Sequence, residues 1–216
     1  MLVLAIDTSG PACDVAILEN ERILVEAREE MTRGQDARLP VLVSDLLYKA
    51  GRSLAKVDRF AVVTGPGSFT GVRVGISFMR GLALALKVPC IGVTSLEAAL
   101  PTGQQGSAFV LLPAKRRPPE ISYWAQRFRS GEAVSEPEEI ALEDLVSELK
   151  AHPHFVYGTR LDALVDHLPG LTVHDATPTA RRAGEIAFTA DPLLTPPSPA
   201  YVRAPDAALP GGRQPS

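Results

Sequence analysis

The stretch Thr64–Arg80 reads TGPGSFTGVRVGISFMR. A short apolar run, residues 60–63, comes before this stretch. The second half of the stretch forms the beginning of a long apolar segment, residues 71–86. Short apolar runs bounded by turn residues are typical of buried strands, whereas long ones are typical of helices. The stretch therefore predicts a strand, a glycine-rich turn and a helix in succession, as in α/β domains.

The turn has the composition of an anion-binding loop but matches neither of two well-known motifs. Gly65 and Gly67 flank Pro66, so the backbone can take left-handed dihedral angles beside a fixed φ, and Thr70 is expected to cap the helix. Such a turn can bring backbone amides close to an anion. A phosphate-binding P-loop requires Lys and Ser/Thr at the helix start, where this chain has valine and arginine. The nucleophile elbow G-x-S-x-G fails because Ser68 lacks glycines at the required spacing.

The predicted helix, residues 71–86, carries Gly71 and Gly75 on one face. Each glycine inside a helix costs up to about 1 kcal/mol relative to alanine, so a pair of them indicates close approach by another helix. Apolar residues continue around the whole helix, which indicates burial on more than one side. The pattern leaves two places for this helix, in the core or under a partner chain.

Composition sets broad limits on the class of protein. A chain of 216 residues with 45% hydrophobic and 22% charged residues suits one large or two small globular domains. A net charge of −3 argues against strong direct binding of nucleic acid. Cys13 and Cys90 lack CxxC spacing and are predicted to be buried free thiols of a reduced compartment. Without a signal peptide or an uncharged apolar run of about 18 residues, we expect a cytoplasmic protein with no membrane span.

The N-terminal half predicts the element order βββαβαβ. Three apolar runs joined by short turns predict an antiparallel meander, and an amphipathic stripe ending at Gly51 predicts a helix that starts near Arg38 and holds Pro40 in its first turn. Helix crossovers between the later strands imply parallel pairing. This is the ribonuclease-H-like layout. The predicted strands are 2–6, 14–18, 23–27, 60–63 and 88–93.

The C-terminal half predicts a degenerate copy of the same layout. Its strands are expected at 108–112, 121–127, 155–157 and 171–173, with helices around 142–149, 161–165 and 179–188. Thr177 or Thr179 is expected to cap the last helix. A basic, proline-rich loop is predicted at 113–119, where Lys115-Arg116-Arg117 forms a solvated surface or an anion or RNA contact. The expected division is an N-terminal lobe 1–103, a C-terminal lobe 104–190 and a proline-rich tail 191–216 that packs on the lobes or is partly disordered.

Few side chains suggest chemistry. Asp7 ends the first strand and is followed by Thr8 and Ser9, so its carboxylate could bind a metal-bound phosphate or a water, or could close the turn with an Asx bond. The four histidines do not have metal-ligand spacing, and no Ser/His/Asp set can be identified. No metal site and no catalytic residue are predicted.

Several segments resemble the TsaB (YeaZ-like) family. The similarity lies in LAIDTS at 4–9, VAI at 15–17, GPGSFTGVRVGI at 65–76, IGVTSL at 91–96 and PAYVR at 199–203, and it is closer in the first half of the chain. The resemblance implies an actin-like ATPase (ASKHA) fold of two ribonuclease-H-like lobes, the second one degenerate.

The resemblance also implies a function in tRNA modification. Members of this family are paralogues of TsaD, which transfers a threonylcarbamoyl group to N6 of the adenosine next to the anticodon in tRNAs reading codons that start with A. This chain lacks the metal-binding histidines of TsaD and would be its non-catalytic partner. It would bind TsaD through the N-terminal lobe, help to form the docking site of TsaE, form a homodimer when TsaD is absent, and meet tRNA only through the complex.

The same resemblance suggests two groups of site residues. Asp7, Thr8 and Ser9 are the possible nucleotide-binding residues; no cofactor is required, although ATP or ADP is possible where TsaB, TsaD and TsaE meet. The expected interface, in which glycines allow helices to pack closely between subunits, comprises Leu39, Leu42, Val43, Leu46, Gly65, Pro66, Gly67, Ser68, Phe69, Thr70, Gly71, Val72, Arg73, Gly75, Phe78 and Met79.

The chain departs from the family pattern at two places, and two alternative functions remain open. Many members carry a histidine near Gly34 and Asp-Ala-Arg where this chain has Pro113-Ala114-Lys115. The alternatives are a stand-alone ATPase or kinase of the same fold, and a glycopeptidase-like hydrolase. Neither is supported by a nucleophile, a histidine pair or a second phosphate loop.

Overall fold

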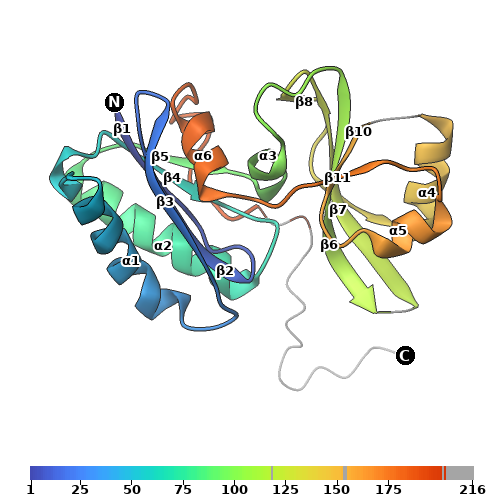
Figure 1. Cartoon of the computed structure of the whole chain (residues 1–216), viewed down its shortest axis with the longest axis horizontal. Coiled ribbons are helices and arrows are strands. Elements are labelled where there is room, and N and C mark those ends of the chain that lie inside the picture. Colours follow the sequence, from blue (N-terminus) through green and yellow to red (C-terminus); the bar gives the residue numbers. More distant parts are fainter. Residues whose placement is uncertain (118, 153–154, 201, 203–216) are drawn as a thin grey trace, which may run out of the picture.

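The computed structural model of the chain describes residues 1–117, 119–152, 155–200 and 202. Two lobes lie side by side, and each is built around one mixed β-sheet (Figure 1). The chain passes from the first sheet to the second after α3 (Ser95–Ala99) and returns to the first lobe after β11 (Val173–Asp175).

The first sheet has the strand order β3-β2-β1-β4-β5. β1, β2 and β3 pair antiparallel, and β4 and β5 extend the sheet in parallel with β1. Short turns allow the antiparallel pairs, whereas the parallel steps need helical crossovers. The predicted ribonuclease-H-like order is confirmed. The strands are β1 (Leu2–Asp7), β2 (Ala12–Glu19), β3 (Arg22–Glu30), β4 (Arg59–Val63) and β5 (Cys90–Val93).

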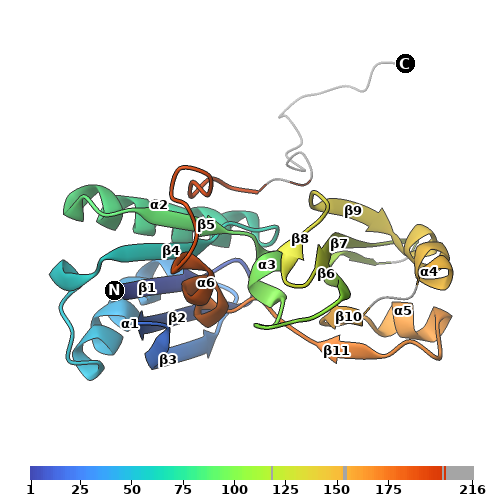
Figure 2. The same ribbon diagram turned by 90° about the horizontal axis from the view of Figure 1, so that it is seen from above.

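Helices cover both faces of this sheet (Figure 2). α1 (Gln35–Lys49) and α2 (Phe69–Leu86) pack on one face, and α6 (Ala180–Ala187) packs on the other. Even-numbered residues of β1 face the first pair of helices and odd-numbered ones face α6, because successive side chains of a strand point to opposite faces. A short 3-10 helix, Leu54–Lys56, leads from α1 into β4.

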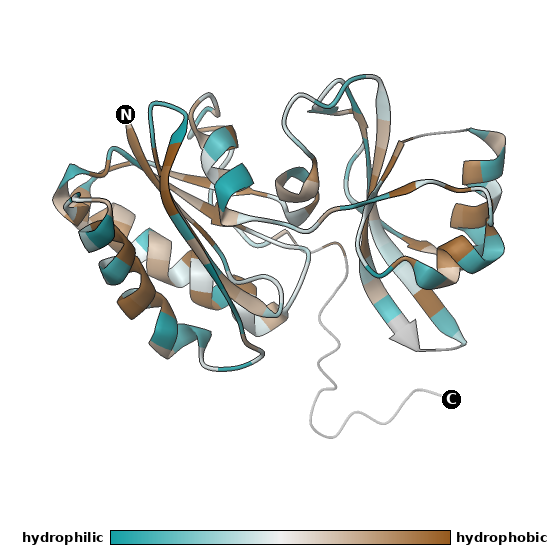
Figure 3. Cartoon of the chain, in the orientation of Figure 1, coloured by the Kyte–Doolittle hydropathy of each residue, from teal (hydrophilic) through white to brown (hydrophobic). Residues whose placement is uncertain are grey.

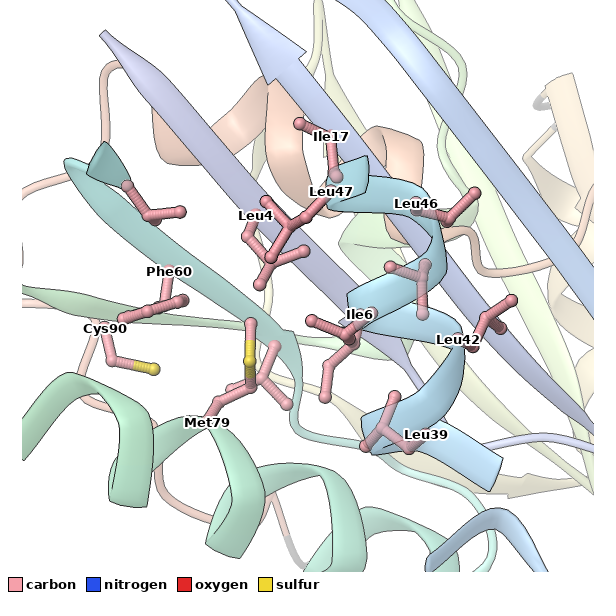
Figure 4. Packing of buried hydrophobic residues seen from close by; sticks show 14 of the residues in the cluster. Leu4, Ile6, Ile17, Leu39, Leu42, Leu46, Leu47, Phe60, Met79 and Cys90 are labelled. Carbon is pink, nitrogen blue, oxygen red and sulfur yellow. The ribbon is translucent and has the colours of Figure 1, made fainter. Parts of the chain in front are cut away.

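The apolar stripe of α1 forms part of the core. Leu39, Leu42 and Leu46 are at most 3% exposed, and Figure 4 shows them near Leu4 and Ile6 of β1. Burying an aliphatic side chain of this size contributes about 1.5–3 kcal/mol. In Figure 3 the turns of α1 alternate between hydrophobic and hydrophilic residues, as expected for a helix with one buried face.

α1 begins at Gln35, earlier than the predicted start at Arg38, so the prediction that Pro40 lies in the first turn is wrong. The amide of Arg38 donates to the carbonyl of Gly34 and closes an earlier turn. Pro40 cannot donate to the carbonyl of Asp36, but Asp36 is exposed, so water can satisfy that group. The helix therefore tolerates an internal proline.

The second sheet has the order β11-β10-β6-β7-β8, and β9 also pairs with β7. One face of this sheet is covered by α4 and α5, and the other meets α3 of the first lobe. The elements are β6 (Ser107–Arg117), β7 (Glu120–Arg129), β8 (Glu132–Ala133), β9 (Glu138–Ala141), α4 (Leu142–Ala151), β10 (Phe155–Gly158) and α5 (Asp162–His167), followed by β11.

The basic loop predicted at 113–119 is wrong, because β6 continues through this region and pairs with β7 as a hairpin. Pro113 has no N–H to donate, and the pairing register shifts between Pro113 and Lys115, so an irregularity in the strand accommodates the proline. Lys115 forms an ion pair with Glu120 across the hairpin. Pro118 lies outside the described residues.

The last helix belongs to the first lobe. Ala180, Ala183 and Ala187 of α6 are fully buried against the first sheet, although residues 104–190 were predicted to form the second lobe. Small side chains let the helix lie close to the strands, and Gly184 faces Leu18 of β2. The stripe of alanines carries little hydrophobic signal, so the sequence did not indicate this docking.

Thr179→Ala is expected to lower the free energy of unfolding by about 1 kcal/mol, because the Thr179 hydroxyl caps α6 by accepting from the amide of Arg182 at 3.1 Å. Urea-induced unfolding followed by circular dichroism measures the change. Thr177→Ala is the matched control, since Thr177 was the alternative cap predicted and is exposed. Equal effects of the two substitutions would contradict the assignment of Thr179 as the cap.

The described part of the tail packs on the first lobe. The amide of Gly92 in β5 donates to the carbonyl of Thr195, and the amide of Ala200 donates to the carbonyl of Thr64, which precedes the glycine turn. These contacts carry the tail along the β5 edge of the sheet. The remainder of the predicted tail lies outside the described residues, except Val202.

Candidate functional site

The glycine turn, residues 65–67, joins β4 to α2 and lies against the end of β1. Ser68 caps α2, because its hydroxyl accepts from the amide of Gly71 at 3.2 Å, so the prediction that Thr70 is the cap is wrong. The amide of Ser68 donates to the carbonyl of Ser9 at 2.7 Å. The turn is thus held against the segment that follows β1 by main-chain contacts.

Gly71 and Gly75 face the inside of their own lobe. A Cβ at Gly71 would lie 2.0 Å from the carbonyl oxygen of Thr8, and one at Gly75 would lie 2.5 Å from the Thr8 hydroxyl. That hydroxyl donates to the carbonyl of Gly71 at 2.7 Å. The prediction that these glycines allow close packing between subunits is therefore wrong. They allow α2 to approach the end of β1.

Asp7, Thr8 and Ser9 are at most 4% exposed. The carboxylate of Asp7 accepts from the amide of Ser9 at 2.7 Å, which is the Asx bond that the sequence left as one of two possibilities. The hydroxyl of Ser95 donates to that of Ser9 at 3.2 Å. Burial raises the pKa of Asp7 above its ordinary value, although the hydrogen bonds from Ser9 act in the opposite direction. All three side chains are thus largely shielded from solvent within the first lobe.

Asp14 lies opposite Asp7 in the pairing of β1 with β2. Its carboxylate accepts from the amide of Ala180 at 3.1 Å and pairs with Arg28 at 3.3 Å, so it links β2 to the start of α6. Burial is the main cause that raises the pKa of Asp14 to about 6, and the nearby charge of Asp7 adds to it. The sequence analysis missed this residue, because a single Asp inside an apolar strand shows no motif.

The outer face of α2 combines apolar and cationic side chains. The guanidinium of Arg73 lies 3.7 Å from the ring centroid of Phe69, which is 42% exposed, and Leu84 farther along the helix is 82% exposed. A groove of about 540 Å³ runs between this face and the start of α1, and both Arg73 and Ser77 line it. This is an accessible surface with the composition of a protein contact site.

The predicted interface residues divide into two groups. Ser68, Phe69, Thr70 and Arg73 are exposed, whereas Gly67 and Phe78 are half-buried. The remaining predicted residues are buried in the chain's own first lobe, where those of α1 and α2 face the sheet and the other two lie in the turn before α2. These are Leu39, Leu42, Val43, Leu46, Gly65, Pro66, Gly71, Val72, Gly75 and Met79. Sequence reasoning missed Val74, Ser77 and Leu84, of which the helical period places the last two opposite the glycines.

The described residues hold no group of three or more His, Cys, Asp or Glu side chains that could bind a metal ion. His154 lies outside the described residues. Cys13 and Cys90 are buried free thiols, and burial is the main cause that raises their pKa values to about 11 and about 12. By length and composition α2 could cross a membrane, but core helices pass the same test, and one face of α2 packs on the sheet.

Comparisons with known proteins agree with this architecture. The family model described as TsaD, tRNA N6-adenosine threonylcarbamoyltransferase, matches residues 29–132. The tRNA threonylcarbamoyladenosine biosynthesis protein TsaB of Escherichia coli is 38% identical over 141 residues, which cover 64% of this chain. A Pseudomonas aeruginosa structure, described as similar to peptidase YeaZ, has a TM-score of 0.73 at 28% identity and covers 94% of this chain and 99% of its own. These similarities confirm the resemblance of the chain to the TsaB family.

The fold of this TsaB-like chain is also found in distant proteins. The ROK hexokinase of Thermus thermophilus has a TM-score of 0.51 at 14% identity, covers 88% of this chain and 98% of its own, and shows the fold alone. Together with the sheet orders above, it confirms the predicted actin-like ATPase fold. The match with the E. coli protein spans 60% of that protein's length.

Proposed function

We propose that the chain is a non-catalytic, cytoplasmic scaffold subunit of tRNA threonylcarbamoyladenosine biosynthesis. It binds a TsaD homologue, together with TsaE, while TsaD transfers the threonylcarbamoyl group to N6 of the adenosine next to the anticodon. Similarity to the TsaB proteins of Escherichia coli and Bacillus subtilis supports the pathway. The observation that carries the scaffold role is the exposed outer face of α2 and the groove beside it.

That face has the features of a contact surface. Phe69, Val74 and Leu84 give it apolar area, and the guanidinium of Arg73 stacks on the ring of Phe69. Aromatic and arginine side chains carry much of the binding energy in protein interfaces, and exposed apolar patches commonly mark them. The surface belongs to the N-terminal lobe, to which the family resemblance assigns TsaD binding.

The same surface would hold a second copy of the chain when TsaD is absent, since both partners would compete for one apolar face. TsaE would join at the edge of the TsaD complex, where ATP or ADP could bind between subunits. Nucleotide contact through Asp7, Thr8 or Ser9 is secondary in this proposal, because these side chains are buried. tRNA would be reached through the complex.

Ser77→Arg is expected to weaken binding of the TsaD homologue by about 100-fold or more, since it places a long charged side chain in the groove beside α2. Light scattering of the protein alone and mixed with the TsaD homologue measures the masses, and calorimetry measures the affinity. Ser147→Arg is the matched control, because Ser147 is an exposed helical serine in the second lobe. Substituting Gly75 does not test the interface, since it alters the fold.

The scaffold proposal fails if the wild-type chain forms no complex with the TsaD homologue, or if Ser77→Arg and Ser147→Arg bind it equally well. Loss of the complex with Ser77→Arg alone, while both variants unfold at the same urea concentration as the wild type, would support it.

A further inference from the structure

A second groove, of about 790 Å³, lies between the two lobes, and none of the residues that line it belongs to the glycine turn or to α2. Glu97 of α3 lines it from the first lobe, and Gln126 of β7 and Glu136 line it from the second. Val202 of the C-terminal segment also lines it. The proposed scaffold function does not use this groove.

The charged side chains that line the groove are carboxylates. Glu97 and Glu136 contribute carboxylates, and no Lys or Arg is among the described residues that line it. One oxygen of Glu97 accepts from the amide and hydroxyl of Thr94, which fixes the carboxylate at the start of α3. Two carboxylates without a lining cation disfavour a phosphate or another anion and favour a cation.

Gln126 gives independent evidence that a ligand of this groove carries hydrogen-bond donors. Gln126 is only 4% exposed, and its Nε2 donates to the carbonyl of Ser135 at 3.0 Å. The Nε2 end of the amide therefore has a partner, and Oε1 is the atom left to accept a hydrogen bond. That Oε1 has no hydrogen-bond partner among the described residues. Buried acceptors are nearly always satisfied, because an unmade hydrogen bond is costly.

We propose that this groove between the lobes binds an alkylguanidinium or alkylammonium group. Its N–H groups donate to Oε1 of Gln126 and to the carboxylates of Glu97 and Glu136. Val134 and Val202 provide an apolar wall for the alkyl stem, as long cationic side chains require. A guanidinium suits the site because it has several donors in one plane and no acceptor.

Agmatine, which carries both cationic groups, is the probe. We expect its titration into the ¹⁵N-labelled full chain to shift the amide signals of Glu97 and Gln126 saturably, while N-butylacetamide and inorganic phosphate leave them in place. Glu97→Gln should weaken agmatine binding about tenfold, since it removes one charge-assisted hydrogen bond. Asp144→Asn on α4, outside the groove, is the control and should leave the affinity unchanged.

Because Glu97 also caps α3, Glu136→Gln provides a second variant at an exposed position, with an expected loss of about threefold. An acetylated Gly-Arg-Gly amide tests whether the cation belongs to a polypeptide or is a free small molecule. If the peptide binds more tightly than agmatine, the groove takes an arginine side chain of a polypeptide. If the peptide binds more weakly, the groove takes a free cation. The proposal is overturned if agmatine causes no saturable shift, if phosphate or N-butylacetamide binds equally well, or if Glu136→Gln and correctly folded Glu97→Gln keep the wild-type affinity.

Discussion

Gly71→Ala is expected to lower the free energy of unfolding by about 3 kcal/mol or more. The added Cβ would lie 2.0 Å from the carbonyl oxygen of Thr8, a main-chain atom at the end of β1 that cannot rotate away. Relieving the overlap requires α2 to move from the sheet, which would also break the hydrogen bond from the Thr8 hydroxyl to the carbonyl of Gly71. Urea-induced unfolding, followed by fluorescence and circular dichroism, measures the loss.

Gly81→Ala on the same helix is the matched control. Apart from its chain neighbours and its own helix backbone, no atom of the described residues lies within 4 Å of the position its Cβ would take, and the residue is exposed. Alanine is the better helix former, so this variant should be more stable than the wild type by about 0.5–1 kcal/mol. If both substitutions changed the stability in the same direction, the close approach of α2 to Thr8 would not be the reason for Gly71.

The wild-type chain is expected to lose about 3 kcal/mol of stability through Asp14 as the pH rises from 4 to 7. This carboxyl has a pKa of about 6 in the folded chain against an ordinary value of 3.8, because burial disfavours its charge. Between these two values the folded state binds more protons than the unfolded state, so stability falls as pH increases. The destabilisation caused by ionised Asp14 is therefore complete above pH 6 and absent below pH 4.

Asp14→Asn removes this titration and can keep the cap on the amide of Ala180 through its carbonyl oxygen. The difference in unfolding free energy between wild type and variant should therefore change by about 3 kcal/mol from pH 4 to pH 7, in favour of the variant at the higher pH. Taking the difference cancels groups that titrate in both proteins. Asp166→Asn in α5 is exposed and should give a constant difference. A constant difference for Asp14→Asn would contradict the raised pKa.

These predictions separate stability from recognition on the same helix. Gly71 and Gly75 act on the fold, because they let α2 contact the end of β1. Phe69, Arg73 and Ser77 lie on the outer face and are available to a partner. A substitution on the inner face would weaken a complex only by destabilising the lobe, so unfolding and binding must be measured for every variant.

The sequence by itself determined the order of elements in the first lobe and the resemblance to the TsaB family. Local patterns carry this information: the apolar runs of β1, β2 and β4 predict strands, and the stripe of α1 predicts a helix with one buried face. The segment GPGSFTGVRVGI indicated the resemblance to the TsaB family because the motif is long and continuous. The second lobe was predicted less well, since Pro113 suggested a loop where a strand with a register shift forms.

Only the tertiary structure decided which face each helix presents and which distant residues meet. Hydropathy could not show which face of α2 is buried, because apolar residues occur all round the helix. The close approach of Gly71 to Thr8 shows that the glycine face packs inward. The return of α6 to the first lobe depends on the shape of small alanines rather than on their hydrophobicity. The groove between the lobes is lined by both Glu97 and Gln126, which lie in different lobes. Residues that are far apart in the sequence and close in space leave no periodic signal in a single sequence.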